Sequence, residues 1–329
     1  MKHATRLSDL GLEGVDRILA TAKAWKAKPH PKHLRDKILG MVFFNPSLRT
    51  RASFEAVMAR GGGSAIVIEA GSGSWKLEDR VGVVMDGDRA EHLKEAVPVL
   101  SRYVDALAVR SFAGGTNDDA DHDDAVMRAF QQYATVPTIS MESAREHPCQ
   151  GLADLLTIEE QFEPGRALPV TLTWAPHIKP LPKAVPNSFL LTAAARGCDI
   201  RVAHPKGFEL HPDILREAQP YAAANGGSIS FFHEQDAALS GSRAVYAKAW
   251  GPATSARLEP EAIREHADWM MTPEQMEKAA DDAIFLHCLP VRRNLEVADG
   301  VLDGKWSRVI DQAENRFHVQ RALLDWLLN

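Results

Sequence analysis

Two guanidinium groups and two hydroxyl groups occur within residues 47–51, directly after a short apolar run. We predict that the apolar run, residues 38–44, is a buried strand and that a helix follows it, because Phe54, Val57 and Met58 repeat at helical spacing. The unpaired N–H groups and the dipole of a helix N-terminus favour an anion. The segment therefore predicts a site for a phosphate-bearing ligand. Simple helix capping with solvated arginines is the alternative interpretation.

Two further polar clusters stand beside apolar segments. His147-Pro148-Cys149-Gln150 precedes a helix-like stretch at 152–162, and His287-Cys288-Leu289-Pro290 follows a short apolar run. Taken alone, His147 could be a loop residue with no partner. A histidine beside Cys288 suggests a cysteine nucleophile, since an imidazolium can activate a thiolate. Adjacent residues of an extended strand point to opposite faces, however, so we do not expect His287 to take the proton of the thiol.

The three motifs, in this order and at this wide spacing, resemble those of the carbamoyltransferases, the family that contains aspartate and ornithine carbamoyltransferase. The resemblance extends from the first helix to residues 312–316, so it covers nearly the whole chain. It implies transfer of the carbamoyl group of carbamoyl phosphate to an amine, through a tetrahedral oxyanion, with phosphate as the leaving group. Such a reaction needs well-placed donors and cations rather than a covalent nucleophile.

The resemblance also implies roles for individual residues. The expected catalytic residues are Arg49, His147, Gln150 and Cys288. The residues expected to bind carbamoyl phosphate are Ser47, Leu48, Arg49, Thr50, Trp75, Arg110, His147, Gln150, Cys288, Leu289 and Arg316. In this branch of the family a neighbouring subunit donates the residue that Trp75 resembles, so we expect a homotrimer. From its position alone, Arg110 would be interpreted as a solvated charge at the end of a strand.

Departures from ornithine carbamoyltransferase concern the acceptor amine. Residues 246–251 stand where those enzymes carry a Ser-Met-Gly loop for free ornithine, and several other segments resemble the branch that acts on ornithine with an acylated α-nitrogen. The residues expected to bind the acylornithine are Ala90, Glu142, His177, Lys248, Leu289 and Arg292. Lys248 and Arg292 would pair with carboxylates, and Arg293 is an alternative to Arg292.

Two positions bear on the acyl group. Where this chain has Ala90, acetyl-specific enzymes of the branch carry glutamate and succinyl-specific ones carry proline. A glutamate there would repel the distal carboxylate of a succinyl group, whereas alanine removes both the charge and the bulk. Glu296 stands where the acetyl enzyme has a carboxylated lysine, whose negative end a glutamate could replace. The proline-rich run at 177–189 is also closer to the succinyl form, so we expect N-succinyl-L-ornithine as the acceptor, within arginine biosynthesis, with N-acetylornithine as the alternative.

Short apolar runs alternate with helix-like stretches along the chain, which is typical of a mostly parallel sheet. The expected strands cover residues 38–44, 65–68, 106–109, 170–174, 200–203, 244–247 and 283–286. With the resemblance, this pattern predicts an α/β fold of two parallel-sheet domains with the active site in the interdomain cleft. The expected domains are a carbamoyl-phosphate domain, 1–150 with the final helix 312–329, and an acylornithine domain, 151–311. The Pro164-Gly165 pair marks a break close to this boundary.

The composition argues against several other classes of protein. A chain of 329 residues with a formal net charge of −6 can bury two cores and has no basic surplus for nucleic acid. The sequence contains no apparent signal peptide or membrane span, and its three cysteines lack regular metal-ligand spacing, so we expect a cytoplasmic protein without disulfides, metal or cofactor. His122 lies within the acidic residues 118–124, but nothing else in the sequence converges there. We interpret this segment as a solvated acidic loop.

Two functions from other classes remain as alternatives. A non-catalytic carbamoyl-phosphate sensor could keep the fold without turnover, but the chain retains Arg49, Arg110, His147 and Arg316. A nucleotide-binding regulator could use the glycine-rich residues 71–74, which lack both the dinucleotide fingerprint and the phosphate-loop lysine.

Overall fold

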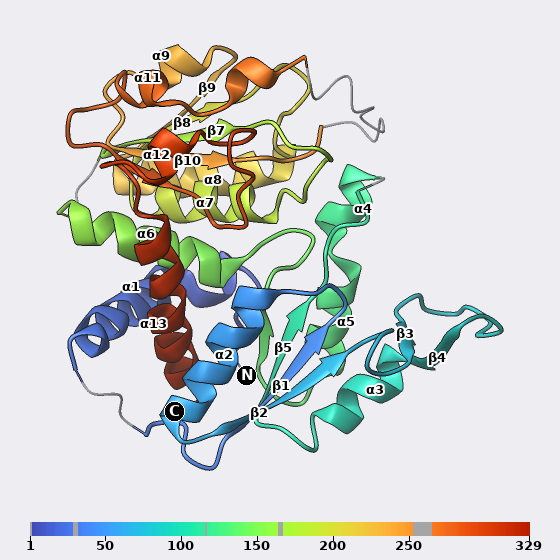
Figure 1. Cartoon of the computed structure of the whole chain (residues 1–329). Helices are drawn as coiled ribbons and strands as arrows, with labels where there is room; N and C mark the ends of the chain where they lie inside the picture. Colours follow the sequence, from blue (N-terminus) through green and yellow to red (C-terminus); the bar gives the residue numbers. More distant parts are fainter. Residues whose placement is uncertain (1, 29–31, 116, 164–166, 253–264) are drawn as a thin grey trace. The chain divides into compact units, whose positions relative to one another are not determined.

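The protein, for which we used a computed structural model, is described here over residues 2–28, 32–115, 117–163, 167–252 and 265–329, and it divides into two compact units. Unit 1 runs up to Ala113 and adds Asp123–Cys149 and Arg316–Asn329, while unit 2 comprises Gly114–His122 and Gln150–Asn315 (Figure 1). These units differ from the domains expected from the sequence at residues 114–122, at Gln150 and at residues 312–315. The Pro164-Gly165 pair lies outside the described residues.

Unit 1 is built on a four-stranded parallel sheet with the strand order β2-β1-β5-β6. The central strands are buried along almost their whole length, as expected for a parallel sheet covered on both faces. The strands are β1 (Ile38–Phe43), β2 (Ser64–Glu69), β5 (Ala106–Arg110) and β6 (Thr138–Ser140), and the helices are α1 (Leu7–Lys26), α2 (Leu48–Gly61), α3 (Leu93–Leu100) and α5 (Ala125–Tyr133).

A short two-stranded ribbon stands apart from this sheet. It consists of β3 (Lys76–Glu78) and β4 (Arg89–His92), which pair in parallel with Leu77 opposite Glu91. In Figure 1 the ribbon extends from unit 1 beyond α3. Trp75 and Ala90 therefore belong to this ribbon rather than to the main sheet.

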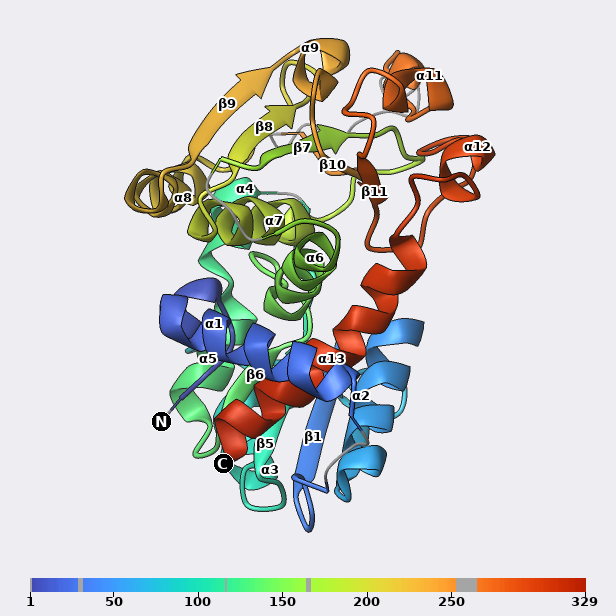
Figure 2. The ribbon, with the colours of Figure 1, turned by 90° about the vertical axis from the view of Figure 1, so that its left-hand side faces the viewer.

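Unit 2 contains a five-stranded parallel sheet with the order β11-β10-β7-β8-β9. Figure 2 shows α7 and α8 on one face of this sheet and α9 and α11 on the other. The strands are β7 (Pro169–Trp174), β8 (Asp199–Ala203), β9 (Ser228–Phe232), β10 (Ala244–Lys248) and β11 (Ile284–Leu286). The helical segments are α4 (Asp118–Asp123), α6 (Pro148–Gln161), α7 (Ala184–Ala195), α8 (Pro212–Asn225), α9 (Gln235–Leu239), η1 (Ala267–Trp269), α11 (Pro273–Met276), α12 (Asp299–Leu302) and α13 (Val309–Leu328). The first residues of α6 and the residues of α13 from Arg316 belong to unit 1.

All seven expected strands form, so the two-domain α/β prediction is confirmed. The sequence did not predict β3, β4, β6 and β9. Three of these have only three or four residues, and β9 is an edge strand whose side chains are mostly not buried, so none of them carries a long apolar run.

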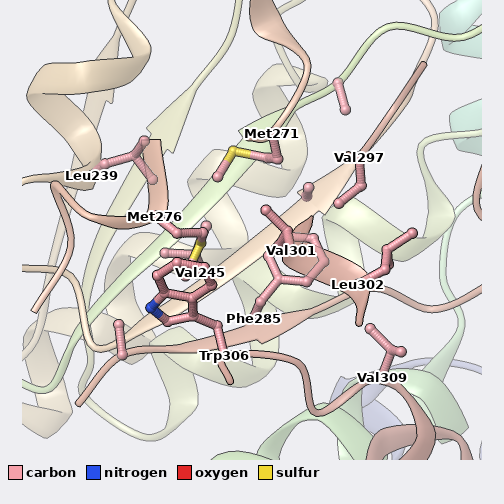
Figure 3. Close-up of a cluster of buried hydrophobic side chains, with 13 residues drawn as sticks. Leu239, Val245, Met271, Met276, Phe285, Val297, Val301, Leu302, Trp306 and Val309 are labelled. Atoms are coloured by element: carbon pink, nitrogen blue, oxygen red, sulfur yellow. The ribbon is translucent and has the colours of Figure 1, made fainter. Parts of the chain in front are cut away.

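The core of unit 2 fixes both ends of one loop. Phe285 on β11 and Val297 are fully buried in the same apolar cluster, together with Trp306 and Val245 (Figure 3). The residues between Phe285 and Val297 include His287, Cys288, Leu289 and Arg292. Burial of the two flanking apolar side chains therefore holds this polar loop in place.

Within the described residues, no helix combines the length and the apolar character needed to cross a bilayer. All three cysteines are free thiols, with Cys149 and Cys198 buried and Cys288 partly exposed. Burial raises the pKa of the Cys149 and Cys198 thiols to about 12, so neither is a thiolate near neutral pH.

Candidate active site

The expected phosphate loop lies where β1 ends and α2 begins. Ser47 has an extended backbone conformation, and its hydroxyl accepts a hydrogen bond from the Thr50 backbone N–H at 3.3 Å, so it caps α2. In the folded chain Arg316 joins this loop from α13, because its Nη2 donates to Thr50 Oγ1 at 2.9 Å and both side chains are buried. The fold thus places a cation beside the helix N-terminus, where the helix dipole also favours an anion.

The two arginines of this loop are not equivalent. Arg51 is exposed, and its guanidinium binds two carboxylates, with Nε 3.2 Å from Glu55 and Nη1 2.7 Å from Glu69. Arg49 is half-buried. Because two carboxylates already neutralise Arg51, the structure does not support Arg51 as a phosphate ligand.

Arg110 lies at the end of β5 and is only 7% exposed. Its Nη1 is 2.6 Å from Glu142 Oε2 and 3.3 Å from the Met141 carbonyl oxygen, and its guanidinium stacks on Phe112 at 4.4 Å. The interpretation as a solvated strand-end charge is therefore wrong. Glu142 has a positive φ of 124°, a conformation that costs free energy for a residue with a side chain and is found most often at functional sites.

His147 lies in a loop of unit 1, but it is buried and interacts with the charges of Arg316 and Arg110, so the alternative of a loop residue with no partner is wrong. Burial lowers its pKa well below the ordinary value of 6.5, and the positive charges of Arg316 and Arg110 lower it further. The imidazole is therefore neutral near physiological pH. A neutral imidazole N–H can still donate a hydrogen bond to a carbonyl oxygen, which is the role expected for His147 toward the carbamoyl group.

In unit 2 the side chain of Gln150 is oriented by a residue that the sequence analysis missed. Gln150 Nε2 donates to Asp154 Oδ1 at 2.7 Å, and the same oxygen accepts from Gln312 Nε2 at 2.6 Å. Gln312 Oε1 in turn accepts from the His287 backbone N–H at 2.9 Å. All of these groups are buried. Asp154 lies one helical turn after Gln150, and this i, i+4 spacing is the feature of the sequence from which their contact could have been predicted.

The His287–Pro290 segment offers backbone groups rather than a nucleophile. His287 Nδ1 accepts from the Leu289 backbone N–H at 3.0 Å, and its Nε2 lies 3.8 Å from Glu296 Oε1. Both nitrogens of the imidazole are thus directed to groups other than the Cys288 thiol. The N–H of Leu289 is engaged and Pro290 has none, so neither residue offers a backbone donor to a ligand. Leu289 has a positive φ of 53°, a second strained position in the expected site.

Arg292 and Arg293 are neighbours in sequence but have different partners. Arg293 is exposed and binds Asp299 at 2.6 Å and Asp303 at 2.7 Å. Arg292 Nε instead donates to His177 Nε2 at 3.1 Å. The alternative in which Arg293 binds the substrate is therefore not supported, and Arg292 remains the candidate.

The imidazole of His177 is held in one tautomer. Because Nε2 accepts from Arg292, the neutral ring carries its proton on Nδ1, so of the two Lys179 backbone groups near Nδ1 the carbonyl oxygen at 2.9 Å is the partner rather than the N–H at 3.2 Å. Burial lowers the pKa of His177, so this neutral form persists below pH 6.5.

Lys248 and Glu296 are two buried charged residues of unit 2, near the residues expected to bind the acylornithine. Lys248 ends β10, is 7% exposed and donates from Nζ to the Ala249 carbonyl oxygen at 3.1 Å, so it is not a solvated strand-end ammonium. Glu296 accepts from the Arg292 backbone N–H at 2.6 Å. Its burial opposes ionisation, but contacts with His287 and the charge of Lys248 outweigh that effect and lower its pKa. Glu296 is therefore a buried carboxylate near neutral pH.

Trp75 and Ala90 are carried by the exposed ribbon. Trp75 is 59% exposed and donates from Nε1 to Glu91 Oε2 at 2.8 Å. Ala90 is also exposed, on the neighbouring strand. A large aromatic residue and a small residue thus lie together on a projecting element of unit 1.

The acidic segment differs from its sequence interpretation. Residues 118–123 form the short helix α4 rather than a loop, and His211 and Asp213 converge on His122. The expectation that nothing else approaches His122 is wrong, because His211 and Asp213 are distant in sequence and follow an unrelated strand.

The fold and these residues define a two-domain α/β protein with an anion-binding loop at the carboxyl end of a central strand. Two family models match the chain, namely the carbamoyl-P binding domain of aspartate/ornithine carbamoyltransferase over residues 2–160 and its Asp/Orn binding domain over residues 182–327. The chain belongs to the aspartate/ornithine carbamoyltransferase family, and its relatives place it in the N-acylornithine branch.

Two relatives differ in the acyl group named. The chain is 38% identical to the N-acetylornithine carbamoyltransferase of Xanthomonas campestris pv. campestris, over 98% of this chain and 97% of the relative. It is 39% identical to the N-succinylornithine carbamoyltransferase of Bacteroides thetaiotaomicron, over 96% of this chain and 95% of the relative. Sequence identity alone therefore does not distinguish the two acyl groups.

Solved structures agree with this family. An acetylornithine transcarbamylase complexed with acetylcitrulline superimposes with a TM-score of 0.96 at 37% identity and covers 100% of both chains. A variant N-acetyl-L-ornithine transcarbamylase, in which a glutamate is replaced by alanine, was solved with carbamyl phosphate and N-succinyl-L-norvaline, and its TM-score is also 0.96, at 37% identity, over 99% of this chain and 100% of that chain.

Proposed function

We propose that this protein transfers the carbamoyl group of carbamoyl phosphate to the δ-amine of N-succinyl-L-ornithine, giving N-succinyl-L-citrulline and phosphate in arginine biosynthesis. The alternative acceptor is N-acetyl-L-ornithine. The observation that carries the choice is Ala90, an exposed alanine on the ribbon where the acetyl-specific branch is expected to have a glutamate.

Carbamoyl phosphate binding is proposed for the residues of unit 1 around the α2 N-terminus. Arg49, Arg110 and Arg316, with Thr50 and the helix N-terminus, supply positive potential for the phosphate. Ser47 and Leu48 supply the turn and its backbone groups. His147 donates from its neutral imidazole to the carbamoyl oxygen, where negative charge develops in the transition state.

In unit 2, Gln150 and the Cys288–Leu289 carbonyls are proposed to hold the carbamoyl NH₂ group. Because Asp154 accepts from the Gln150 amide nitrogen, the Gln150 amide oxygen is the end left to accept from the substrate. This arrangement positions the carbonyl carbon for attack and requires no covalent intermediate. The amine attacks that carbon, the C–O bond to phosphate breaks, and the amine proton is lost to the leaving phosphate or to solvent.

The acceptor is proposed to bind through Glu142, His177, Lys248, Leu289 and Arg292. Lys248 and Arg292 are cations suited to carboxylates, and His177 fixes Arg292 through the 3.1 Å hydrogen bond. Glu142 orients the substrate nitrogen. Glu296 is a buried negative charge in unit 2 that offsets Lys248.

Support for succinyl comes from electrostatics and from one solved relative. N-succinylornithine carries a distal carboxylate that a glutamate at position 90 would repel, and Ala90 carries no charge. The solved acetylornithine transcarbamylase with a glutamate replaced by alanine holds N-succinyl-L-norvaline, an analogue with the same acyl group. This parallel supports the succinyl proposal.

The test is to measure citrulline-type product from carbamoyl phosphate with N-succinylornithine, N-acetylornithine and ornithine in parallel, for the wild type and Ala90→Glu. We expect the succinyl compound to have the highest kcat/KM in the wild type and Ala90→Glu to shift the preference toward acetyl by about tenfold or more. A wild-type preference for acetylornithine would refute the specificity proposal while leaving the carbamoyl transfer intact. Tight carbamoyl phosphate binding without turnover of any amine would favour a sensor.

We further propose a homotrimer in which Trp75 acts in the site of a neighbouring subunit. Trp75 is 59% exposed on a projecting ribbon, which suits a residue that reaches another molecule. Two inactive variants, Trp75→Ala and Arg49→Met, test this by mixing after dissociation. Donation in trans predicts that mixed trimers regain activity, because some sites then combine an intact Arg49 with an intact Trp75. Mixed trimers without activity, or a monomer by sedimentation, would disprove it.

A further inference from the structure

Two imidazoles and a carboxylate meet in unit 2, among residues that the proposed function does not use. His122 lies on α4, and His211 and Asp213 lie at the start of α8. One potential ligand atom from each of the three lies within 4.8 Å of the other two. The two histidine rings are stacked at 3.9 Å, and their side chains are only 12% and 11% exposed.

Carboxylates flank both imidazoles. His122 Nε2 lies 3.4 Å from Asp213 Oδ2, and His211 Nε2 lies 3.0 Å from Asp119 Oδ1. The other oxygen of Asp213 binds Arg216. A ligating carboxylate is commonly held in this way by a second hydrogen bond. We name His122, His211, Asp213 and Asp119 the α4–α8 cluster.

We propose that the α4–α8 cluster binds a transition-metal ion of the Zn²⁺ type. Two imidazoles and one or two carboxylates form a donor set that suits Zn²⁺, whereas Mg²⁺ and Ca²⁺ prefer oxygen ligands alone. Tetrahedral Zn²⁺ at its usual ligand distances brings ligand atoms to about 3.3 Å from one another. The ligand atoms now lie within 4.8 Å of one another, so shifts of at most about one ångström for each atom would bring them to that value.

Metal binding would change two local hydrogen bonds. His211 Nδ1 accepts from the Asp213 backbone N–H at 3.2 Å, so His211 Nε2 carries the proton and donates to Asp119. Coordination through Nε2 requires that proton to move to Nδ1, so the helix-capping hydrogen bond is lost and the metal bond replaces the donation to Asp119. The charge of the ring does not change in this step.

The consequence would be an additional link between residues 114–122 and the remainder of unit 2. The chain leaves unit 1 after Ala113 and returns at Asp123. Lys183 Nζ already binds Asp118 at 2.9 Å. A metal at the α4–α8 cluster would fix a second point of the same segment, which begins four residues after Arg110. This inference does not depend on the proposed acceptor, because none of these residues contributes to it.

The experiment is a Zn²⁺ titration of the full chain after chelator treatment, read by calorimetry and by the visible spectrum of Co²⁺ substituted for Zn²⁺. His122→Phe keeps an aromatic ring in the stack but removes a ligand. His211→Asn keeps a side chain that can cap α8. His233→Asn is the matched control, because His233 stacks edge-on with His204 at 5.2 Å in the same unit without belonging to the cluster.

We expect one Zn²⁺ per chain in the wild type and in His233→Asn, with affinity at least about tenfold lower in both cluster variants. Zn²⁺ should also slow hydrogen exchange of residues 117–123 in the wild type and in His233→Asn, but not in the two cluster variants. Equal Zn²⁺ affinity in all four proteins, or no saturable binding in the wild type, would overturn the proposal. Mg²⁺ binding as tight as Zn²⁺ binding would overturn it as well, because imidazole ligands do not favour Mg²⁺. Circular dichroism of each variant establishes that it is folded before the comparison is made.

Discussion

The guanidinium of Arg110 and the carboxylate of Glu142 form a close ion pair, with Nη1 2.6 Å from Oε2 and both side chains almost buried. Arg110 is proposed to bind phosphate and Glu142 to bind the acceptor amine. In the absence of substrates each residue therefore serves as the counter-ion of the other. Carbamoyl phosphate must compete with Glu142 for Arg110, and its binding would leave the carboxylate available to the amine.

Replacement of Glu142 by glutamine should affect the two substrates in opposite directions. The variant leaves Arg110 without a carboxylate, so we expect carbamoyl phosphate to bind as tightly as in the wild type or more tightly. The KM for the acylornithine should rise by about tenfold or more, since a charged hydrogen bond contributes about 1.5–3 kcal/mol. Equilibrium binding of carbamoyl phosphate and steady-state kinetics measure the two effects. Weaker carbamoyl phosphate binding in Glu142→Gln would contradict this account of the ion pair.

Arg49 and Arg51 provide a matched pair for the phosphate loop. We expect Arg49→Met to weaken carbamoyl phosphate binding by about tenfold to a hundredfold, because it removes a charge-assisted contact to the phosphate. Arg51→Met should change that affinity by less than about twofold, since Arg51 is exposed and bound to Glu55 and Glu69. Calorimetry with carbamoyl phosphate, or with inorganic phosphate as a stable probe, measures both. An equal loss in the two variants would show that the loop binds through overall charge.

Arg292 and Arg293 provide the corresponding pair for the acceptor. Arg292→Met should raise the KM for the acylornithine by about tenfold or more while leaving that for carbamoyl phosphate unchanged. Arg293→Met should leave both KM values close to wild type, because Arg293 is held by Asp299 and Asp303. Initial-rate kinetics with each substrate varied in turn decide this. A larger effect from Arg293 would mean that the loop turns when substrate binds.

Asp154 is expected to act as a positioning residue. Asp154→Leu removes the Oδ1 atom that accepts from both Gln150 and Gln312, at 2.7 and 2.6 Å. Both donors then lose their acceptor, at a cost of about 1–3 kcal/mol each in the free energy of unfolding. We expect kcat to fall by about tenfold or more with both KM values little changed. Glu160→Gln, which alters a hydrogen bond to Asn315 in the same helix, is the control. A fall in stability with unchanged kcat would assign Asp154 a structural role only.

The lowered pKa of His147 predicts a specific pH dependence of stability. The unfolded chain binds a proton at His147 as pH falls through about 6.5, whereas folded His147 stays neutral because it is buried near Arg316 and Arg110. Its contribution to stability is therefore present above pH 6.5 and is lost as pH falls below that value. Each full unit of pKa difference corresponds to about 1.4 kcal/mol.

The measurement is the change in Tm between pH 7.5 and 5.5 for the wild type and His147→Gln. We expect a smaller change in the variant, because glutamine does not titrate. His92→Gln, at a partly exposed position, should behave as the wild type. Identical changes for all three proteins would show that His147 does not contribute to acid destabilisation.

The sequence alone determined the fold class and most of the expected site. Seven apolar runs specified seven strands, because burial of β1, β5 and β7 on both faces requires continuous apolar residues. The Ser47 cap and the helix that follows it could also be predicted, because capping and helical spacing depend only on residues that are neighbours in the chain.

The tertiary structure decided which surroundings each of several similar side chains receives. Arg51 and Arg293 are exposed and paired with carboxylates, whereas Arg49 is half-buried and Arg292 donates to His177. The contacts of Asp154 with Gln312, and of His122 with Asp213, likewise depend on chain packing. A hydrogen bond forms between groups that folding brings within about 3 Å, and residues 91 or more positions apart in sequence, such as His122 and Asp213, give no local sign of that proximity.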